Sequence, residues 1–137
     1  MVVVSACLLG ENCKYNGGNN YSERVAAFLE GKEIFPVCPE IAAGLGCPRT
    51  PIEIVDGIVT DRNGRVVDDA LRKAVADILE QLKGKDIECV ILKSRSPTCG
   101  VKQVYDGTFS GVLREGAGIL AEALQKAGYT VLDSEDI

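Results

Sequence analysis

The order of apolar runs and helical patterns along the chain limits its fold more than any other feature. Short β-forming apolar runs occupy residues 2–6, 33–37, 87–92 and 129–132. Between the second and third runs, residues 68–82 carry apolar side chains at intervals of three and four, which predicts a helix with one apolar face. Strands that alternate with helices are typical of an α/β fold, so we expect a mostly parallel, Rossmann-like sheet flanked by helices.

Two further helices and a small β-hairpin insertion complete the expected elements. Ser22 is a suitable N-cap for a helix that Gly31 would end, and residues 116–126 form the last helical pattern. Residues 52–55 and 58–60 are apolar runs separated by Asp-Gly, which predicts a hairpin with a primed turn. The 137 residues are expected to form one domain.

Prolines and glycines constrain several other segments. Pro36 cannot donate a hydrogen bond to a neighbouring strand, which places the run 33–37 near a sheet edge. Residues 41–51 are rich in Gly and Pro and are expected to form a surface loop. Turns are expected at Asn63-Gly64 and over residues 105–109.

Charge and hydropathy exclude several classes of protein. The net charge is −5, and no basic cluster is visible beyond Lys93 and Arg95, which argues against duplex nucleic acid as a partner. No apolar run approaches the roughly 20 residues of a membrane span. Residues 1–5 lack the features of a secretory signal, so a cytoplasmic location is expected. The sequence favours no particular oligomeric state.

Cysteine is the residue type that carries the most information about chemistry. The chain has six cysteines and no histidine, which excludes a Cys-His catalytic pair and mixed Cys/His zinc sites. Three of the cysteines follow the carboxyl ends of expected strands, where ligands bind in open α/β sheets: Cys7, Cys38 and Cys99. If those strands are parallel neighbours, the three thiols converge on one rim of the sheet.

The remaining cysteines have different contexts. Cys89 lies within an apolar run and is expected to be a small buried hydrophobe. Cys13 and Cys47 lie in loops near the same rim, without a strand to direct them. No pair has the C-x2-4-C spacing of a structural zinc site or a redox dithiol.

The segment Lys93–Gly100 is expected to hold its cysteine on a constrained loop. It follows an apolar run, and Pro97 requires the strand to end by Ser96. Gly100 permits backbone angles that a side chain would forbid, so Cys99 can occupy a tight loop.

Three convergent thiolates without histidine suit an iron–sulfur cluster held by protein at three irons, with one iron open to substrate. Three interpretations compete with it. The cysteines could be unrelated loop residues. They could form a non-catalytic metal-binding or thiol-redox module, in which Cys13 or Cys47 matters as much as Cys99. The chain could also bind a small ligand without any metal.

Three motifs, in order, resemble the 2-thiouracil desulfidase-like family. The first is Ser5–Gly10 with Lys14–Gly17, and the second is Pro36–Glu40 followed by Gly44-Leu45 and Pro48-Arg49. The third is Lys93–Gly100 with Tyr105–Phe109. The resemblance covers nearly the whole chain. Asn16 stands where the family often has aspartate.

The resemblance implies a [4Fe-4S] cluster bound by Cys7, Cys38 and Cys99. It also implies that the open iron binds the sulfur of a small thiolated substrate such as 2-thiouracil, that water oxygen replaces this sulfur, and that sulfide is released. Glu40 and Ser96 match the proposed catalytic pair. From the residues alone, Glu40 could instead cap a following turn, and Ser96 could be a turn hydroxyl. Cys13 or Cys47 could supply a fourth ligand.

Overall fold

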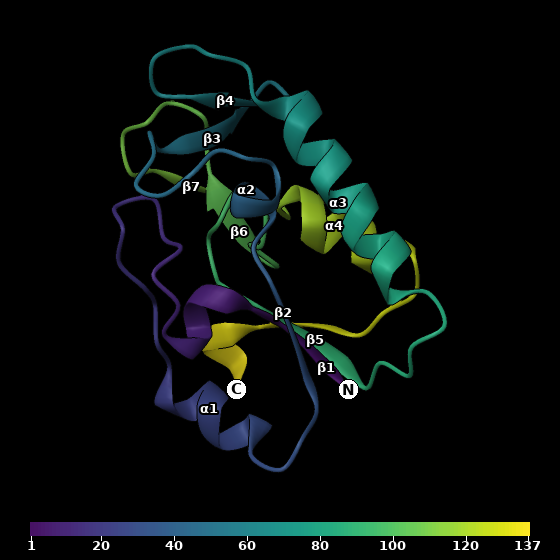
Figure 1. Cartoon of the computed structure of the whole chain (residues 1–137). Helices are drawn as coiled ribbons and strands as arrows, with labels where there is room; N and C mark the ends of the chain where they lie inside the picture. Colours follow the sequence, from purple (N-terminus) through teal and green to yellow (C-terminus); the bar gives the residue numbers. More distant parts are fainter.

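A four-stranded parallel sheet forms the centre of the computed structural model, which describes all 137 residues (Figure 1). Its strand order is β2-β1-β5-β8, and its members are β1 (Val2–Ser5), β2 (Ile34–Val37), β5 (Cys89–Leu92) and β8 (Val131–Asp133). Every residue of β1 and β5 is buried, as continuous apolar runs in parallel strands require. The predicted α/β fold is confirmed, and β2 with its Pro36 is an edge strand.

Helices cover both faces of this sheet because successive side chains of each strand point to opposite sides. The helices α3 (Asp68–Leu82) and α4 (Ile119–Lys126) pack on the face that carries Val3, Val90 and Leu92. Helix α1 (Glu23–Leu29) packs on the other face, against Val2, Val4, Cys89 and Ile91. Figure 1 shows α1 on the side of the sheet opposite α3 and α4.

Local signals gave several element boundaries correctly. Helix α3 has the predicted bounds, and its inward face includes Leu71, Val75 and Ile78. The Ser22 hydroxyl caps α1 by accepting a hydrogen bond from the Val25 backbone N–H at 3.2 Å.

The predicted hairpin is present as β3 (Ile52–Val55) and β4 (Ile58–Asp61). Its Asp56-Gly57 turn has positive φ at both residues, 50° and 80°, as the primed type demands. A second hairpin of β6 (Gln103–Tyr105) and β7 (Leu113–Glu115) was not predicted. Each of its strands has only three residues, and the expected turn at 105–109 lies in the connection between them.

Other segments differ from prediction for local reasons. A short helix α2 (Pro39–Ala42) occupies the start of the expected surface loop, with Pro39 at its first position, where the missing N–H costs nothing. The first strand ends one residue early in a 3-10 helix η1 (Ala6–Leu9), and a second one, η2 (Ser134–Asp136), ends the chain. Helix α4 begins at Ile119 rather than at residue 116. None of the helices has the length and apolar character needed to cross a bilayer.

Candidate metal centre and active site

The carboxyl ends of three adjacent strands meet at one cavity of about 430 Å³. β1 lies between β2 and β5, with Ser5 beside Val37 and Val4 beside Ile91. The residues that follow these strands therefore share one rim. Cys7 in η1, Cys38 at the N-cap of α2, and Cys99 in the loop after β5 all line the cavity. The structure thus brings together the three thiols that the sequence placed after strands.

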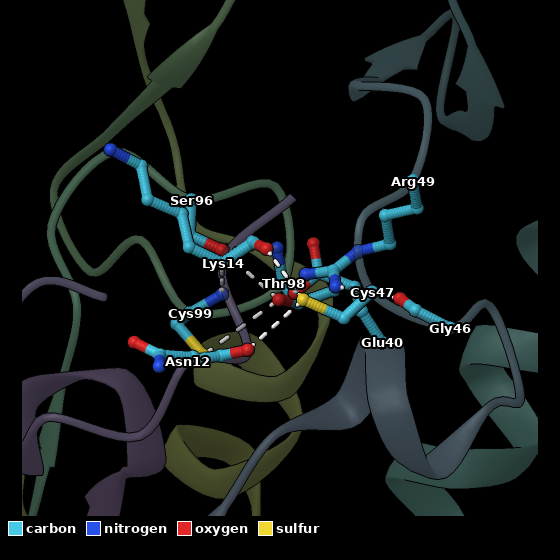
Figure 2. Close-up of polar contacts among 9 residues, drawn as sticks. All are labelled: Asn12, Lys14, Glu40, Gly46, Cys47, Arg49, Ser96, Thr98 and Cys99. Atoms are coloured by element: carbon cyan, nitrogen blue, oxygen red, sulfur yellow. Dashed lines mark hydrogen bonds and ion pairs between the residues drawn. The ribbon is translucent and has the colours of Figure 1, made fainter. Parts of the chain in front are cut away.

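The other three cysteines differ in position. Cys13 is buried and lines the same cavity, and its burial, followed by the nearby Cys38, raises its pKa to about 12. Cys47 is exposed and outside the cavity, where its thiol donates to the backbone oxygens of Asn12 and Lys14 at 3.0 Å (Figure 2). Cys89 is buried beside Val2 at the start of β1, at the opposite end of the strands, as predicted for a core residue.

The loop that carries Cys99 is held by hydrogen bonds at both ends. The Ser96 hydroxyl accepts from the Cys99 backbone N–H at 3.1 Å, and the backbone N–H groups of Ile119 and Leu120 donate to the carbonyls of Pro97 and Thr98. The start of α4 therefore docks directly on the loop. This docking requires glycine at position 118, because a Cβ there would lie only 2.4 Å from the Thr98 carbonyl carbon.

Gly100 is needed in this loop because of space, rather than because of its backbone angles as the sequence suggested. Its φ is not positive, but a Cβ would lie 2.6 Å from the Gln103 carbonyl oxygen and 2.7 Å from that of Ser96. Both distances are too short for any side chain, so only glycine lets the chain turn this closely beside Cys99.

Burial dominates the electrostatics of the thiols. It raises the pKa of Cys7 and Cys38, and it raises the pKa of Cys99 to about 12. Hydrogen bonds from protein groups act in the opposite direction: the Asn20 side chain bonds Cys7, the Ile41 backbone bonds Cys38, and the Ser5 and Thr98 hydroxyls bond Cys99. Each of these sulfurs therefore has at least one partner that favours its thiolate form.

Glu40 pairs with Arg49 beside the thiols. The Arg49 Nη2 lies 3.3 Å from the Glu40 Oε2, and the two side chains are only 6% and 15% exposed (Figure 2). Burial raises the pKa of Glu40, whereas Arg49 and a hydrogen bond with Thr98 act to lower it. The carboxylate therefore holds these contacts instead of capping a following turn. The sequence shows Arg49 and Thr98 only as parts of the motifs, and no local pattern indicates that either acts on Glu40.

Ser96 connects to Glu40 through a second hydroxyl. Its Oγ accepts from the Thr98 backbone N–H at 3.2 Å and lies 3.0 Å from Thr98 Oγ1 (Figure 2). Thr98 is fully buried, and its hydroxyl also lies 3.7 Å from the Cys99 sulfur. Ser96 is therefore a turn hydroxyl, as its position before Pro97 suggested, and it adjoins the Thr98 hydroxyl, which acts to lower the pKa of Glu40.

The cavity is basic although the protein is acidic. Two of the acidic side chains, Glu40 and Glu53, line it, together with five cations: Lys14, Arg49, Arg62, Lys93 and Arg95. The sequence showed only the last two as neighbours. The other three come from separate loops, so their grouping depends on the fold. Arg49 pairs with Glu40 and Arg95 with Glu135, which leaves Lys14, Arg62 and Lys93 as the cations that favour a small anionic ligand.

Comparisons with known proteins identify the family of this chain. The model of a family described as 2-thiouracil desulfurase matches residues 2–136. An uncharacterized protein YbbK of Bacillus subtilis (strain 168) is 35% identical over 147 aligned residues, covering 100% of this chain and 97% of that protein. A solved structure described as [4Fe-4S]-dependent thiouracil desulfidase TudS matches with a TM-score of 0.90 and 32% identity, covering 99% of this chain and 91% of that one.

Proposed function

Because the chain belongs to the 2-thiouracil desulfurase family, we propose that it removes the sulfur of a small thiocarbonyl compound such as 2-thiouracil. In this reaction, water supplies the oxygen that replaces the sulfur, and sulfide is released. We further propose that Cys7, Cys38 and Cys99 hold a [4Fe-4S] cluster. The observation that carries the proposal is the meeting of these three thiols with the buried Glu40 in one cavity.

The donor set suits a cluster better than a single metal ion. No three His, Cys, Asp or Glu side chains lie close enough together to hold one ion. Cluster ligands bind different irons, so their sulfurs need not converge on one point. The three proposed ligands are each fixed next to a strand end and each have a hydrogen-bond partner, and such partners tune the reduction potential of a cluster.

When bound, such a cluster would supply a Lewis-acidic iron that polarises the carbon–sulfur bond and accepts the departing sulfide. Glu40 takes the role of general base and removes a proton from the attacking water. Arg49 holds the carboxylate in place through the 3.3 Å ion pair, and the low exposure of both side chains limits competition from bulk solvent.

The hydroxyl chain gives the proton a defined route. Thr98 is the hydroxyl that lowers the pKa of Glu40, and Ser96 lies 3.0 Å from it, so a proton can pass from the carboxyl to Thr98 while Thr98 releases its own proton to the Ser96 oxygen in the cavity wall. Ser96 thus serves as the outer proton donor toward the substrate, with Thr98 as the intermediate. The basic side chains around the cavity favour the anionic form of a thiolated pyrimidine.

We place this reaction in the cytoplasm, since all six cysteines are free thiols and reducing compartments preserve thiols. The expected partner is a small thiolated molecule.

Anaerobic reconstitution with iron and sulfide, followed by assay of sulfide release from 2-thiouracil, tests the proposal. The wild-type protein should bind about four irons per chain and release sulfide. Glu40→Gln should keep its iron and lose turnover, whereas Glu30→Gln, at the exposed end of α1, should keep both. A cluster that forms without turnover on a panel of thiolated bases would contradict the desulfidase assignment.

A non-catalytic thiol-redox module is the second candidate, favoured by the presence of Cys13 and Cys38 in the lining of one cavity. The two functions differ in what they require of Cys13. A desulfidase with three cluster ligands should retain its iron and its turnover in Cys13→Ser. A redox module should lose its response to oxidants in the same variant, which is measured by counting free thiols after peroxide treatment.

A further inference from the structure

Aromatic residues from three segments form an aromatic wall of the cavity: the loop before α1, strand β6 and the loop between β6 and β7. The protein has only four tyrosines and three phenylalanines. Three of these seven residues line the cavity that holds the thiols: Tyr15, Tyr105 and Phe109. The proton route and the cluster ligands use none of them, so this wall has no role in the chemistry described above.

The buried carboxylate of Glu53 holds the loop between β6 and β7. Glu53 on β3 is only 8% exposed, and its Oε1 accepts hydrogen bonds from the backbone N–H groups of Gly107 at 2.9 Å and Phe109 at 3.1 Å. One side chain of the first hairpin therefore fixes the connection of the second hairpin. Figure 1 shows β3 close to β6 and β7, and residues of β3 and β6 are in contact.

The backbone of the loop has little freedom. Gly107 has φ of +94°, and a Cβ there would lie 2.7 Å from the Ile54 carbonyl oxygen, so this position accepts only glycine. Phe109 has φ of +55°, a region that bulky side chains rarely occupy. Such a conformation persists only where its surroundings hold it, and the Glu53 carboxylate bonds the N–H of this same residue.

This arrangement has a consequence for ligand binding. Phe109 lines the cavity in an unfavourable backbone conformation, so the fold maintains that conformation against its local preference. The flat face of a phenyl ring is a good partner for another planar ring. Thiolated pyrimidines are planar, and the cavity provides the thiol ligands, the base and this wall in one space.

We propose that Phe109 contacts the planar ring of the substrate and that Glu53 is a positioning residue that holds Phe109 for this contact. The proposal rests on the desulfidase function for the identity of the substrate ring. Glu53 acts through two accepted hydrogen bonds and not through its charge, so glutamine, whose amide oxygen also accepts, should replace it.

The test compares Phe109→Leu, Glu53→Ala and Glu53→Gln with the wild type, and Glu115→Ala on β7 serves as an exposed control from the same hairpin. Phe109→Leu keeps an apolar side chain, although a smaller one, but removes the flat ring. We expect it and Glu53→Ala to raise KM for 2-thiouracil about tenfold, the scale of one aromatic contact, with a smaller change in kcat. Glu53→Gln and the control should stay near wild type, and iron content should be the same in all.

Binding of 2-thiouracil to the cluster-loaded proteins, measured by anaerobic calorimetry, separates this proposal from the desulfidase assignment. Turnover by the wild type with unchanged KM and Kd in Phe109→Leu would overturn the role of Phe109 and leave the desulfidase standing. Binding without turnover, weakened in Phe109→Leu, would overturn the desulfidase and support the aromatic wall. If the wild type neither binds nor turns over 2-thiouracil, both are overturned. If Glu53→Ala fails to fold, Phe109→Leu alone decides whether Phe109 contacts the substrate ring. The positioning role of Glu53 is overturned if Glu53→Gln raises the KM for 2-thiouracil as much as Phe109→Leu does.

Discussion

Removal of the Arg49 charge should destabilise the protein strongly, because the Glu40–Arg49 pair is buried. The two charged groups lie 3.3 Å apart with side chains 6% and 15% exposed. Arg49→Met keeps much of the stem volume and leaves the carboxylate without its cation. Loss of one partner from a largely buried ion pair costs about 3–5 kcal/mol of the free energy of unfolding, because the remaining carboxylate is largely shielded from solvent and has lost its cation. We expect a loss in this range at pH 8.

The control is an exposed pair of the same residue types. Arg95 and Glu135 lie closer together, at 2.9 Å, but their side chains are 42% and 49% exposed. Arg95→Met should therefore cost at most about 1 kcal/mol. The double variant Glu40→Gln/Arg49→Met removes both buried charges and should return to within about 1–2 kcal/mol of wild type.

Anaerobic urea unfolding, followed by far-UV circular dichroism on preparations of equal iron content, measures all four proteins. A cost for Arg49→Met no larger than that for Arg95→Met would show that burial does not control the energy of this pair. Failure of the double variant to recover stability would show that the loss comes from packing rather than from an unpaired carboxylate.

Three further outcomes are expected. Cys99→Ser should lower iron and acid-labile sulfide per chain, whereas Cys47→Ser, whose sulfur lies outside the cavity, should leave both unchanged; equal loss in the two variants would contradict the assigned ligands. Thr98→Val removes a buried hydroxyl from the proton route, so it should lower kcat more than it raises KM. The same loss should cost about 1–2 kcal/mol of the free energy of unfolding. An unchanged kcat would exclude this proton route. Burial raises the pKa of Glu40 above its ordinary 4.5, and a general base works only when it is deprotonated. We therefore expect kcat/KM to fall as the pH decreases, with a midpoint above pH 4.5. A midpoint at or below pH 4.5, at constant iron content, would argue against Glu40 as the base.

Patterns confined to single segments made the main elements predictable. The spacing of Leu71, Val75 and Ile78 defined α3, and Asp56-Gly57 defined the hairpin turn, because both depend only on neighbouring residues. Pro36 marked an edge strand because it lacks an N–H donor. The three-residue strands β6 and β7 were not predictable, since their stability depends on contact with β3 and with each other rather than on their own sequence.

The sequence by itself determined which thiols could share a site. Parallel strands must place their carboxyl ends on one side, so Cys7, Cys38 and Cys99 follow from topology once the strands are recognised. Position along the chain also separated Cys89 from them, because it falls inside a strand.

Only the tertiary structure decided which other groups join those thiols. Arg49 reaches Glu40 from a separate loop, Cys13 reaches Cys38 from another, and Glu53 holds Phe109 across two hairpins. Each contact joins residues from different segments and depends on the direction of a side chain in the packed protein. No local pattern records that direction, because it is fixed by how separate elements pack and by which buried polar groups must find partners.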